Sequence, residues 1–403
     1  MCNTNIGAFC HTHDNWQELL SEAPYYLKIK EDGDYVMFSY DQIRTDFSYN
    51  ISREARGIIF RKGQWEYPVC WAFNKFFNHG ESNAADIDWS SAFVTEKIDG
   101  SLIKLWYDEK WHMSTNGCID ARKAEINNVN MANFCKYFYY ALKDIMVYHF
   151  PPCKNFDEDH RVGEFLRELD TNLTYMFELV GPYNRVVVPY DKPDIYFLGA
   201  RNKYTEEELS FRDIQADSAY MLSKLKRPAQ YSLSSLGDCI KAAELKTWDD
   251  EGFVVCDKYF NRVKIKSPAY VLAHYARNNN VITRNYLIDI ILHNEQEEFL
   301  CYAADYKDAL ESCNQLMKSY LYISNQLVKV SRKARRMPRN EYAEMVKEFP
   351  KIFRGLLFLN YDRDMTAEEY TSQWTTYKWE NHLNEMEKLK DEYFFTFGTS
   401  TTC

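Results

Sequence analysis

The sequence lacks the patterns that mark several large classes of protein. Its 11 cysteines are an odd number without any Cys-x-x-Cys pair, which argues against a disulfide framework and against a zinc ribbon. Its apolar runs, such as 57–60, have the length of a strand and are too short to span a bilayer. The first residues show no basic segment followed by an apolar stretch, which is the pattern of a secretory signal. We therefore expect an intracellular protein, cytoplasmic or in another reducing compartment, with no membrane segment.

The chain also lacks a net positive charge, since its formal net charge is −10. A surface that binds nucleic-acid phosphates is usually basic. The exception is the stretch 312–340, which contains no acidic residue. Within it, Lys329, Arg332, Lys333 and Arg336 follow i, i+3, i+4, i+7 spacing and would share one face of a helix. Such a stripe suits phosphate binding. It suits equally the solvated C-terminal end of a helix, where cations interact favourably with the helix dipole.

Strand-like runs alternate with helical patterns up to about residue 270, and helical patterns alone follow Ser267-Pro268. The long pattern at 305–336 would end before Pro338. This organisation predicts an α+β protein with a first domain at 1–270 and a helical domain at 271–403. The candidate strands are 35–40, 57–60, 93–97, 101–107, 174–180, 195–200, 252–256 and 262–266, and the candidate helices of the first domain are 123–148, 161–169, 211–226 and 234–246.

Four short motifs on these candidate strands carry the residues suited to chemistry. The first is Lys97-Ile98-Asp99-Gly100, which by itself would suit a strand–turn–strand corner with an exposed lysine. The others, taken one at a time, would suit solvated charges at strand ends or the wet face of a strand. Their occurrence in a fixed order, each on a candidate strand, favours a functional interpretation. They are Phe177-Glu178, Glu251-Gly252 and Val263-Lys264-Ile265-Lys266.

In this order the motifs resemble those of the covalent nucleotidyltransferase superfamily, which comprises RNA ligases, DNA ligases and mRNA capping enzymes. Within it, the chain is similar to the phage RNA ligase 1 family over about 35–280. The resemblance implies a nucleotidyltransferase core, the ATP-grasp-like DNA/RNA ligase fold, built of antiparallel sheets with flanking helices. It also implies an adenylyltransferase domain at 1–270 and an all-helical RNA-recognition domain at 271–403. The additional segments that carry the likeness are 52–57 (SREARG), 73–78 (FNKFFN), 184–190 (NRVVVPY) and the tail Ser267-Pro268-x-Tyr270.

The resemblance implies that Lys97 attacks ATP and becomes a lysyl-AMP. A free lysine amine has a pKa of about 10.4, so the neutral form is rare at pH 7, a handicap of roughly 4–5 kcal/mol. Burial near other cations favours the neutral amine, and Lys264 and Lys266 are the candidates for that role and for stabilising charge on the α-phosphate. Glu251 would position Mg²⁺ or Mn²⁺. The other expected nucleotide-binding residues are Arg56, Lys75, Glu96, Asp99, Gly100 and Glu178, with Phe77 as a possible stacking partner.

The chain departs from the family at one position. Asn116 stands before Gly117 where the family is expected to carry a basic residue. Either one phosphate contact is lost, or Arg122 or Lys123 supplies it.

The expected reaction transfers AMP from Lys97 to a 5′-phosphate on RNA, after which a 3′-hydroxyl displaces AMP and seals the strand. Tyr270 and the stripe on 329–336 are the candidate RNA contacts. The RNA would be single-stranded or the nicked loop of a tRNA. The chain has no glycine-rich phosphate loop of the GxxxxGK(S/T) kind, so we expect no kinase half within it. A separate end-healing kinase or phosphatase is a candidate partner.

Two alternatives remain. The first is a related transferase, either a DNA ligase or a capping-type enzyme that uses GTP. The absence of a predicted β-barrel after Lys266 speaks against both. The second is an RNA-binding module without activity, and the presence of every expected catalytic residue speaks against it.

Overall fold

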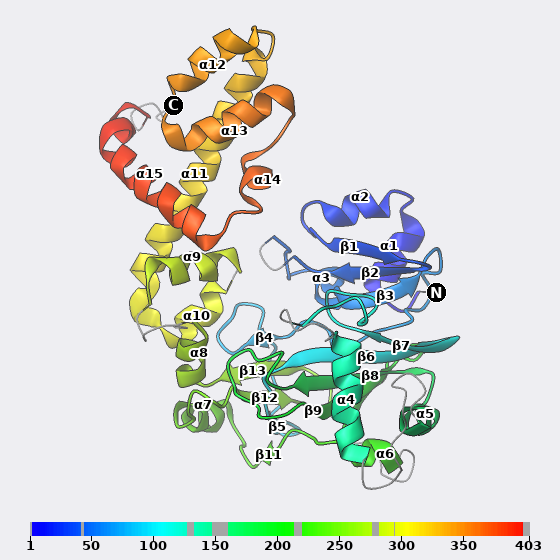
Figure 1. Ribbon diagram of the computed structural model, residues 1–403. Coiled ribbons are helices and arrows are strands. Elements are labelled where there is room, and N and C mark those ends of the chain that lie inside the picture. Colours follow the sequence, from blue (N-terminus) through cyan, green and yellow to red (C-terminus); the bar gives the residue numbers. More distant parts are fainter. Residues whose placement is uncertain are drawn as a thin grey trace. The chain divides into compact units, whose positions relative to one another are not determined.

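The computed structural model describes residues 2–41, 44–126, 133–146, 160–212, 220–275, 282–293 and 295–397. The chain divides into two compact units, Met1–His274 and Tyr275–Cys403 (Figure 1). The boundary predicted from the sequence lies a few residues before this division. Within the described residues, no helix combines the length and the apolar character needed to cross a bilayer.

The first unit begins with a small antiparallel sheet that is covered by helices. The apolar residues of β2 and β3 pack with Ile6 and Leu20 from the N-terminal helices. The other face of this sheet contributes Met37 and Ile59 to a cluster with Trp106, which joins the sheet to the rest of the unit. The elements are α1 (Asn5–Thr12), α2 (Trp16–Ser21), β1 (Lys28–Asp32), β2 (Tyr35–Ser39), α3 (Asn50–Glu54) and β3 (Arg56–Arg61), with sheet order β1-β2-β3.

Two five-stranded sheets form the centre of the unit. One has the order β10-β9-β8-β6-β7 and the other β11-β5-β12-β13-β4. All pairs between these strands are antiparallel except β13 with β4. The strands are β4 (Phe77–Asn78), β5 (Phe93–Glu96), β6 (Ser101–Asp108), β7 (Lys110–Ser114), β8 (Leu173–Val180), β9 (Asp194–Asn202), β10 (Glu208–Ser210), β11 (Gln230–Tyr231), β12 (Gly252–Cys256) and β13 (Arg262–Lys266).

Helices cover the outer faces of these sheets. Phe138 and Leu142 of α4 pack on Phe177 and Phe197 of the first sheet, and Cys239 of α7 packs in a cluster with strands β12 and β13. The inner faces are left to line a cavity between the sheets. The remaining helices of this unit are α4 (Phe134–Met146), α5 (His160–Arg167), α6 (Tyr220–Ser223), α7 (Leu236–Glu244) and α8 (Pro268–Tyr275).

The second unit contains helices and no strand within its described residues. Its long central helix α11 buries Tyr320 against Phe353, Trp374 and Trp379 from the surrounding helices. Its elements are α9 (Arg284–Leu292), α10 (Gln296–Tyr302), the short η1 (Ala304–Tyr306), α11 (Lys307–Ala334), α12 (Arg339–Lys347), α13 (Lys351–Asp362), α14 (Ala367–Thr371) and α15 (Thr376–Phe397). The observed fold class is therefore the predicted one, antiparallel sheets with flanking helices followed by a helical region.

Every candidate strand of the sequence analysis is a strand in the structure. The candidate helix 211–226 is different. Residues 211–212 form a turn, α6 contains only Tyr220–Ser223, and 213–219 lie outside the described residues. Of the candidate helix 123–148, the part that is helical in the described residues is α4.

Candidate active site

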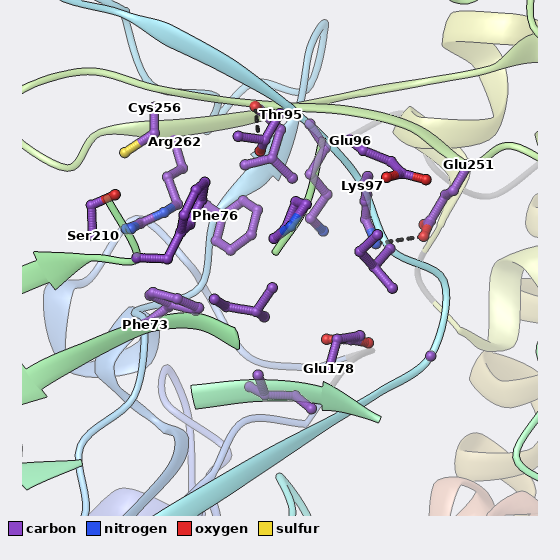
Figure 2. Close-up of a pocket in the computed structure, with 18 of the residues that line it drawn as sticks. Phe73, Phe76, Thr95, Glu96, Lys97, Glu178, Ser210, Glu251, Cys256 and Arg262 are labelled. Atoms are coloured by element: carbon purple, nitrogen blue, oxygen red, sulfur yellow. Dashed lines mark hydrogen bonds and ion pairs between the residues drawn. The ribbon is translucent and has the colours of Figure 1, made fainter. Parts of the chain in front are cut away.

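A cavity of about 310 Å³ lies between the two five-stranded sheets. Figure 2 shows Lys97 and Glu251 at one end of it, Glu178 on the opposite wall, and Phe73, Ser210, Cys256 and Arg262 toward the other end. The expected site residues that line it are Arg56, Glu96, Lys97, Gly100, Asn116, Glu178, Glu251, Lys264 and Lys266. Residues more than two hundred positions apart in the sequence thus share one pocket.

Lys97 follows directly after β5 and is held there by the neighbouring strand, because its backbone N–H donates to the carbonyl of Gly252 at 2.9 Å. Its Nζ donates to Glu251 Oε2 at 2.7 Å, and the side chains are 20% and 4% exposed. Lys266 Nζ lies 3.6 Å from the other carboxylate oxygen, Oε1. The nearest charged partner of the amine is therefore a carboxylate and not one of the two expected cations. An ion pair favours the charged amine, so Lys97 must lose a proton before it can act as a nucleophile.

The register of the sheet explains why these three charges meet. On β12, Phe253 is paired with Glu96 and Gly252 with Lys266, so Glu251 comes next to both Lys97 and Lys266. Gly252 has φ +124°, and a Cβ there would lie 2.2 Å from the carbonyl oxygen of Ile265. Glycine is therefore required at this position, where the chain enters β12.

Glu178 stands on the facing sheet, where β8 pairs it with Leu102 of β6. Loss of contact with bulk water raises its pKa to about 7, an effect that Lys97 opposes and that Glu251 increases. A carboxyl group with this pKa changes its charge near neutral pH, as groups in functional pockets often do. Burial likewise raises the pKa of Glu96, against a hydrogen bond from the N–H of Ala229.

Arg56 and Lys264 form a basic wall beside one aromatic ring. The Arg56 guanidinium carbon and Lys264 Nζ each lie 5.2 Å from the centre of the Phe76 ring. Within the described residues, Arg56 Nη1 and Asn116 Oδ1 are buried and have no hydrogen-bond partner. Buried polar atoms are nearly always satisfied in native proteins, so these two atoms are available to a ligand.

The structure does not bring Arg122 or Lys123 to this wall. Arg122 pairs with Asp120, Lys123 pairs with Asp32, and neither lines the cavity. These two candidates therefore do not replace the basic residue that was expected at Asn116.

Lys75 lies in a second cavity of about 380 Å³, which shares Phe76 and Arg262 with the first. Its Nζ is 4.7 Å from the ring centres of both Tyr40 and Phe47. Phe77, the expected stacking partner, is buried beneath Lys75. Lys75 and Phe77 thus line a cavity that adjoins the pocket containing Lys97, and not that pocket itself.

Asp99 and Tyr270 also occupy positions other than those expected. Both are buried, and the Tyr270 hydroxyl donates to Asp99 Oδ1 at 2.8 Å. The backbone N–H groups of Val187 and Val188 donate to the other oxygen at 2.9 and 2.7 Å. Asp99 therefore anchors the segment after β8 and helix α8, and a buried Tyr270 offers no surface to a nucleic acid.

No group of three or more His, Cys, Asp or Glu residues suited to a metal ion occurs in the part of the chain that the structure describes. Glu251, at the expected metal position, is thus not part of such a group within the described residues. This fits Mg²⁺ or Mn²⁺ held partly by substrate, since Mg²⁺ is commonly bound through one or two carboxylates together with phosphates.

Several residues of the cavity were not predicted from the sequence. They include Phe73 and Phe76 from the FNKFFN segment and Arg262, the first residue of β13. Arg262 lies over the Phe73 ring and, with Arg201, pairs with the buried Glu208. The aromatic residues flanking Lys75 were a usable signal in the sequence, whereas nothing local marks Arg262 or Glu208.

The stripe predicted on the helical domain lies on and just after α11, and all four of its cations are exposed. Arg332 Nε pairs with Asp364 at 2.8 Å. Within the described residues, no ion pair joins Lys329, Lys333 or Arg336 to a carboxylate.

Comparison with known proteins identifies the family. The sequence profile of a family described as RNA ligase matches residues 54–270. A protein of Autographa californica nuclear polyhedrosis virus, provisionally named a bifunctional polynucleotide kinase/RNA ligase, is 29% identical over 68% of this chain. This chain covers 39% of that protein's length. An RNA ligase of Rhodothermus phage RM378 is 27% identical, with 75% of this chain and 76% of the phage protein covered.

Among solved structures, an archaeal ATP-dependent RNA ligase matches with 13% identity and a TM-score of 0.43, with 75% of each chain covered. The family profile matches more than half of the 403 residues, from just before β3 to the first turn of α8. The chain therefore belongs to the RNA ligase family.

Proposed function

We propose that this protein seals RNA ends with ATP, through a covalent AMP on Lys97. The observation that carries the proposal is the arrangement of Lys97, paired with Glu251, in a cavity that also contains Arg56, Glu178 and Lys264. Membership of the RNA ligase family supports the same conclusion.

The residues present suit ATP. Arg56, Lys264 and Lys266 gather positive charge along the cavity, which favours the binding of a polyphosphate. The unpaired Nη1 of Arg56 and Oδ1 of Asn116 offer one donor and one acceptor. Glu178 offers a carboxyl group to a hydroxyl of the sugar, and the apolar side chains of Leu102, Val254 and the cavity phenylalanines suit a base.

In the first step, Lys97 Nζ forms a bond to the α-phosphorus and the bond from that phosphorus to pyrophosphate breaks. Glu251 Oε2, at 2.7 Å, is the atom positioned to receive the proton that the amine must lose. Lys264 and Lys266 would offset the negative charge that develops on the phosphate. A divalent cation on Glu251 would add positive charge beside the same phosphate.

The substrate of the later steps is RNA with a 5′-phosphate and a 3′-hydroxyl. AMP passes from Lys97 to the 5′-phosphate, and the 3′-hydroxyl then displaces AMP. The nicked loop of a tRNA is a candidate, with the exposed cations of α11 as the contact. Ends that lack these groups would first be healed by a kinase or phosphatase activity outside these 403 residues. The viral relative carries the name of a kinase joined to an RNA ligase, which supports this division of labour.

The test is transfer of label from α-labelled ATP to the protein in the presence of Mg²⁺ or Mn²⁺. We expect label that survives denaturing electrophoresis, that is absent in Lys97→Ala, and that is retained in Lys241→Ala, which removes an exposed lysine of α7 outside the cavity. Label from GTP instead of ATP would indicate a capping-type enzyme, and no label from either would contradict the proposal. Labelled protein should then seal single-stranded RNA. Exclusive sealing of nicked DNA would indicate a DNA ligase.

A further inference from the structure

Lys104 is a buried cation that the proposed reaction leaves without a role. It lies on β6, is 0% exposed, and is paired across the sheet with Ser114 on β7 and Met176 on β8. Within the described residues it forms no ion pair, and its Nζ donates to the carbonyl of Gly57 at 2.5 Å. A buried charge without an opposite charge is costly, so its presence calls for an explanation beyond packing.

The hydrogen bond of Lys104 leads directly to the basic wall of the cavity. Gly57 follows Arg56 at the start of β3 and has φ +72°. A Cβ on Gly57 would lie 2.4 Å from Lys104 Nζ and 2.9 Å from the carbonyl oxygen of Asn116. Gly57 is therefore packed closely against both the Lys104 amine and the Asn116 backbone. Arg56 and Asn116 both line the cavity, and Lys104 does not.

We propose that Lys104 is a positioning residue for ATP binding, whose amine holds the Gly57 carbonyl and thereby fixes Arg56 and Asn116 on the cavity wall. The proposal rests on the proposed function and adds a residue to it. Lys104 acts through the two residues that present unpaired polar atoms to the ligand, and it places a fixed charge behind them. A cation at this point also compensates for the absence of a basic residue at position 116, which neither Arg122 nor Lys123 supplies.

The experiment compares ATP with AMP, because a defect in the phosphate-binding wall affects the triphosphate most. Affinities are measured by calorimetry in the Lys97→Ala background, where no covalent AMP forms. Lys104→Met is expected to weaken ATP binding at least about ten-fold and AMP binding less than about three-fold. The matched control is Lys203→Met, which removes another buried lysine whose Nζ donates to a backbone carbonyl, that of Tyr107 at 2.6 Å, outside the cavity. It should change neither affinity by more than about three-fold.

Unchanged ATP affinity in Lys104→Met, or equal losses for ATP and AMP, would overturn the proposal. If the Lys97→Ala protein with Lys104 intact binds neither nucleotide, the proposed function itself fails, and that outcome is read before any Lys104 variant is measured.

A second measurement applies even if Lys104→Met does not fold. Burial lowers the pKa of Lys104 to about 8, with Arg56 lowering it further and Cys70 opposing the shift. Ser114 and Met176, opposite it on the flanking strands, do not titrate. The preference of the Lys104-containing protein for ATP over AMP should therefore fall as pH rises from about 7.5 to 9. A preference that stays constant over this range would overturn the proposal.

Discussion

At the scale of single residues, the Glu251 carboxylate is the charge on which the site depends. It is 4% exposed, and in the described residues Lys97 and Lys266 are the two cations within ion-pair distance of it. Either lysine alone can still neutralise Glu251, whereas removal of both leaves a buried carboxylate without a counter-charge. We therefore expect Lys97→Met and Lys266→Met to be coupled. Each should lower the free energy of unfolding by about 1–2 kcal/mol, and the double variant by at least about 1 kcal/mol more than the sum.

The measurement is a double-mutant cycle by chemical denaturation at pH 7. Lys241→Met, in α7 and outside the cavity, serves as the reference partner. Its change in unfolding free energy should add to that of Lys97→Met without coupling. Additive losses for Lys97→Met and Lys266→Met would show that Glu251 is not shared between them.

Glu178 gives a second prediction at this scale, because its pKa is raised from 4.5 to about 7 in the folded protein. Between these values the folded state binds more protons than the unfolded state, so the contribution of Glu178 to stability falls as pH rises, by at most about 1.4 kcal/mol per pH unit. Glu178→Gln removes this dependence. The stability of the variant relative to the parent should therefore increase from pH 5 to pH 7 and then level off.

The readout is the difference in unfolding free energy between the two proteins at each pH, in which most other titrating groups cancel. A difference that does not change between pH 5 and 8 would mean that Glu178 keeps an ordinary pKa.

At the scale of elements, the site depends on how closely β6 approaches β8. Gly100 lines the cavity directly before β6, and a Cβ there would lie 2.5 Å from the Leu179 carbonyl oxygen and 3.2 Å from Glu178 Cγ. Gly100→Ala should push the two strands apart, lower the free energy of unfolding by about 1–3 kcal/mol and slow the labelling of Lys97. The control is Gly237→Ala on α7, where the atom nearest to a Cβ would be Ser235 Oγ at 3.9 Å. Equal effects of the two substitutions on stability would contradict the close approach of β6 and β8.

The elements themselves show how far the sequence could be interpreted. The central strands were predictable because apolar runs such as 174–180 are buried and bounded by turn residues. The elements that were missed are short or lie at edges, such as β4 and β11 with two residues each and the exposed β1, KIKED. These strands form because they hydrogen-bond to the backbone of a neighbouring strand. Such pairing is not visible in the local sequence pattern.

The candidate site was predictable in its sheet residues and less so in the segments between them. Lys97, Glu251 and Lys266 lie close together because β12 is the neighbour of both β5 and β13. The sequence motifs had predicted this grouping. Lys75 and Tyr270 lie in segments whose direction is fixed by tertiary packing. The Lys75 amine lies over aromatic rings, and the Tyr270 hydroxyl donates a hydrogen bond to Asp99. No spacing rule within the sequence distinguishes these outcomes from residues that face the cavity.

At the scale of the whole molecule, RNA binding must be reconciled with a formal net charge of −10. Such a protein is repelled by a polyanion over most of its surface, so binding requires a local concentration of cations. Lys329, Lys333 and Arg336 provide one on the helical unit, and within the described residues no ion pair neutralises them. Their effect should appear in the sealing steps and not in the reaction with ATP, because the cavity that contains Lys97 lies within the first unit.

The last prediction follows from this separation. Replacement of Lys329, Lys333 and Arg336 by alanine should leave labelling of Lys97 by ATP unchanged. It should raise the KM for RNA about ten-fold at moderate salt. It should also reduce the slope of log KM against log salt concentration by about two to three. The control replaces Lys307, Lys347 and Lys388, which are also exposed but are paired with glutamates on their own helices, and so changes the net charge by the same amount. If both triple variants lose RNA affinity equally, total charge governs binding. If neither does, the RNA contacts lie elsewhere on the chain.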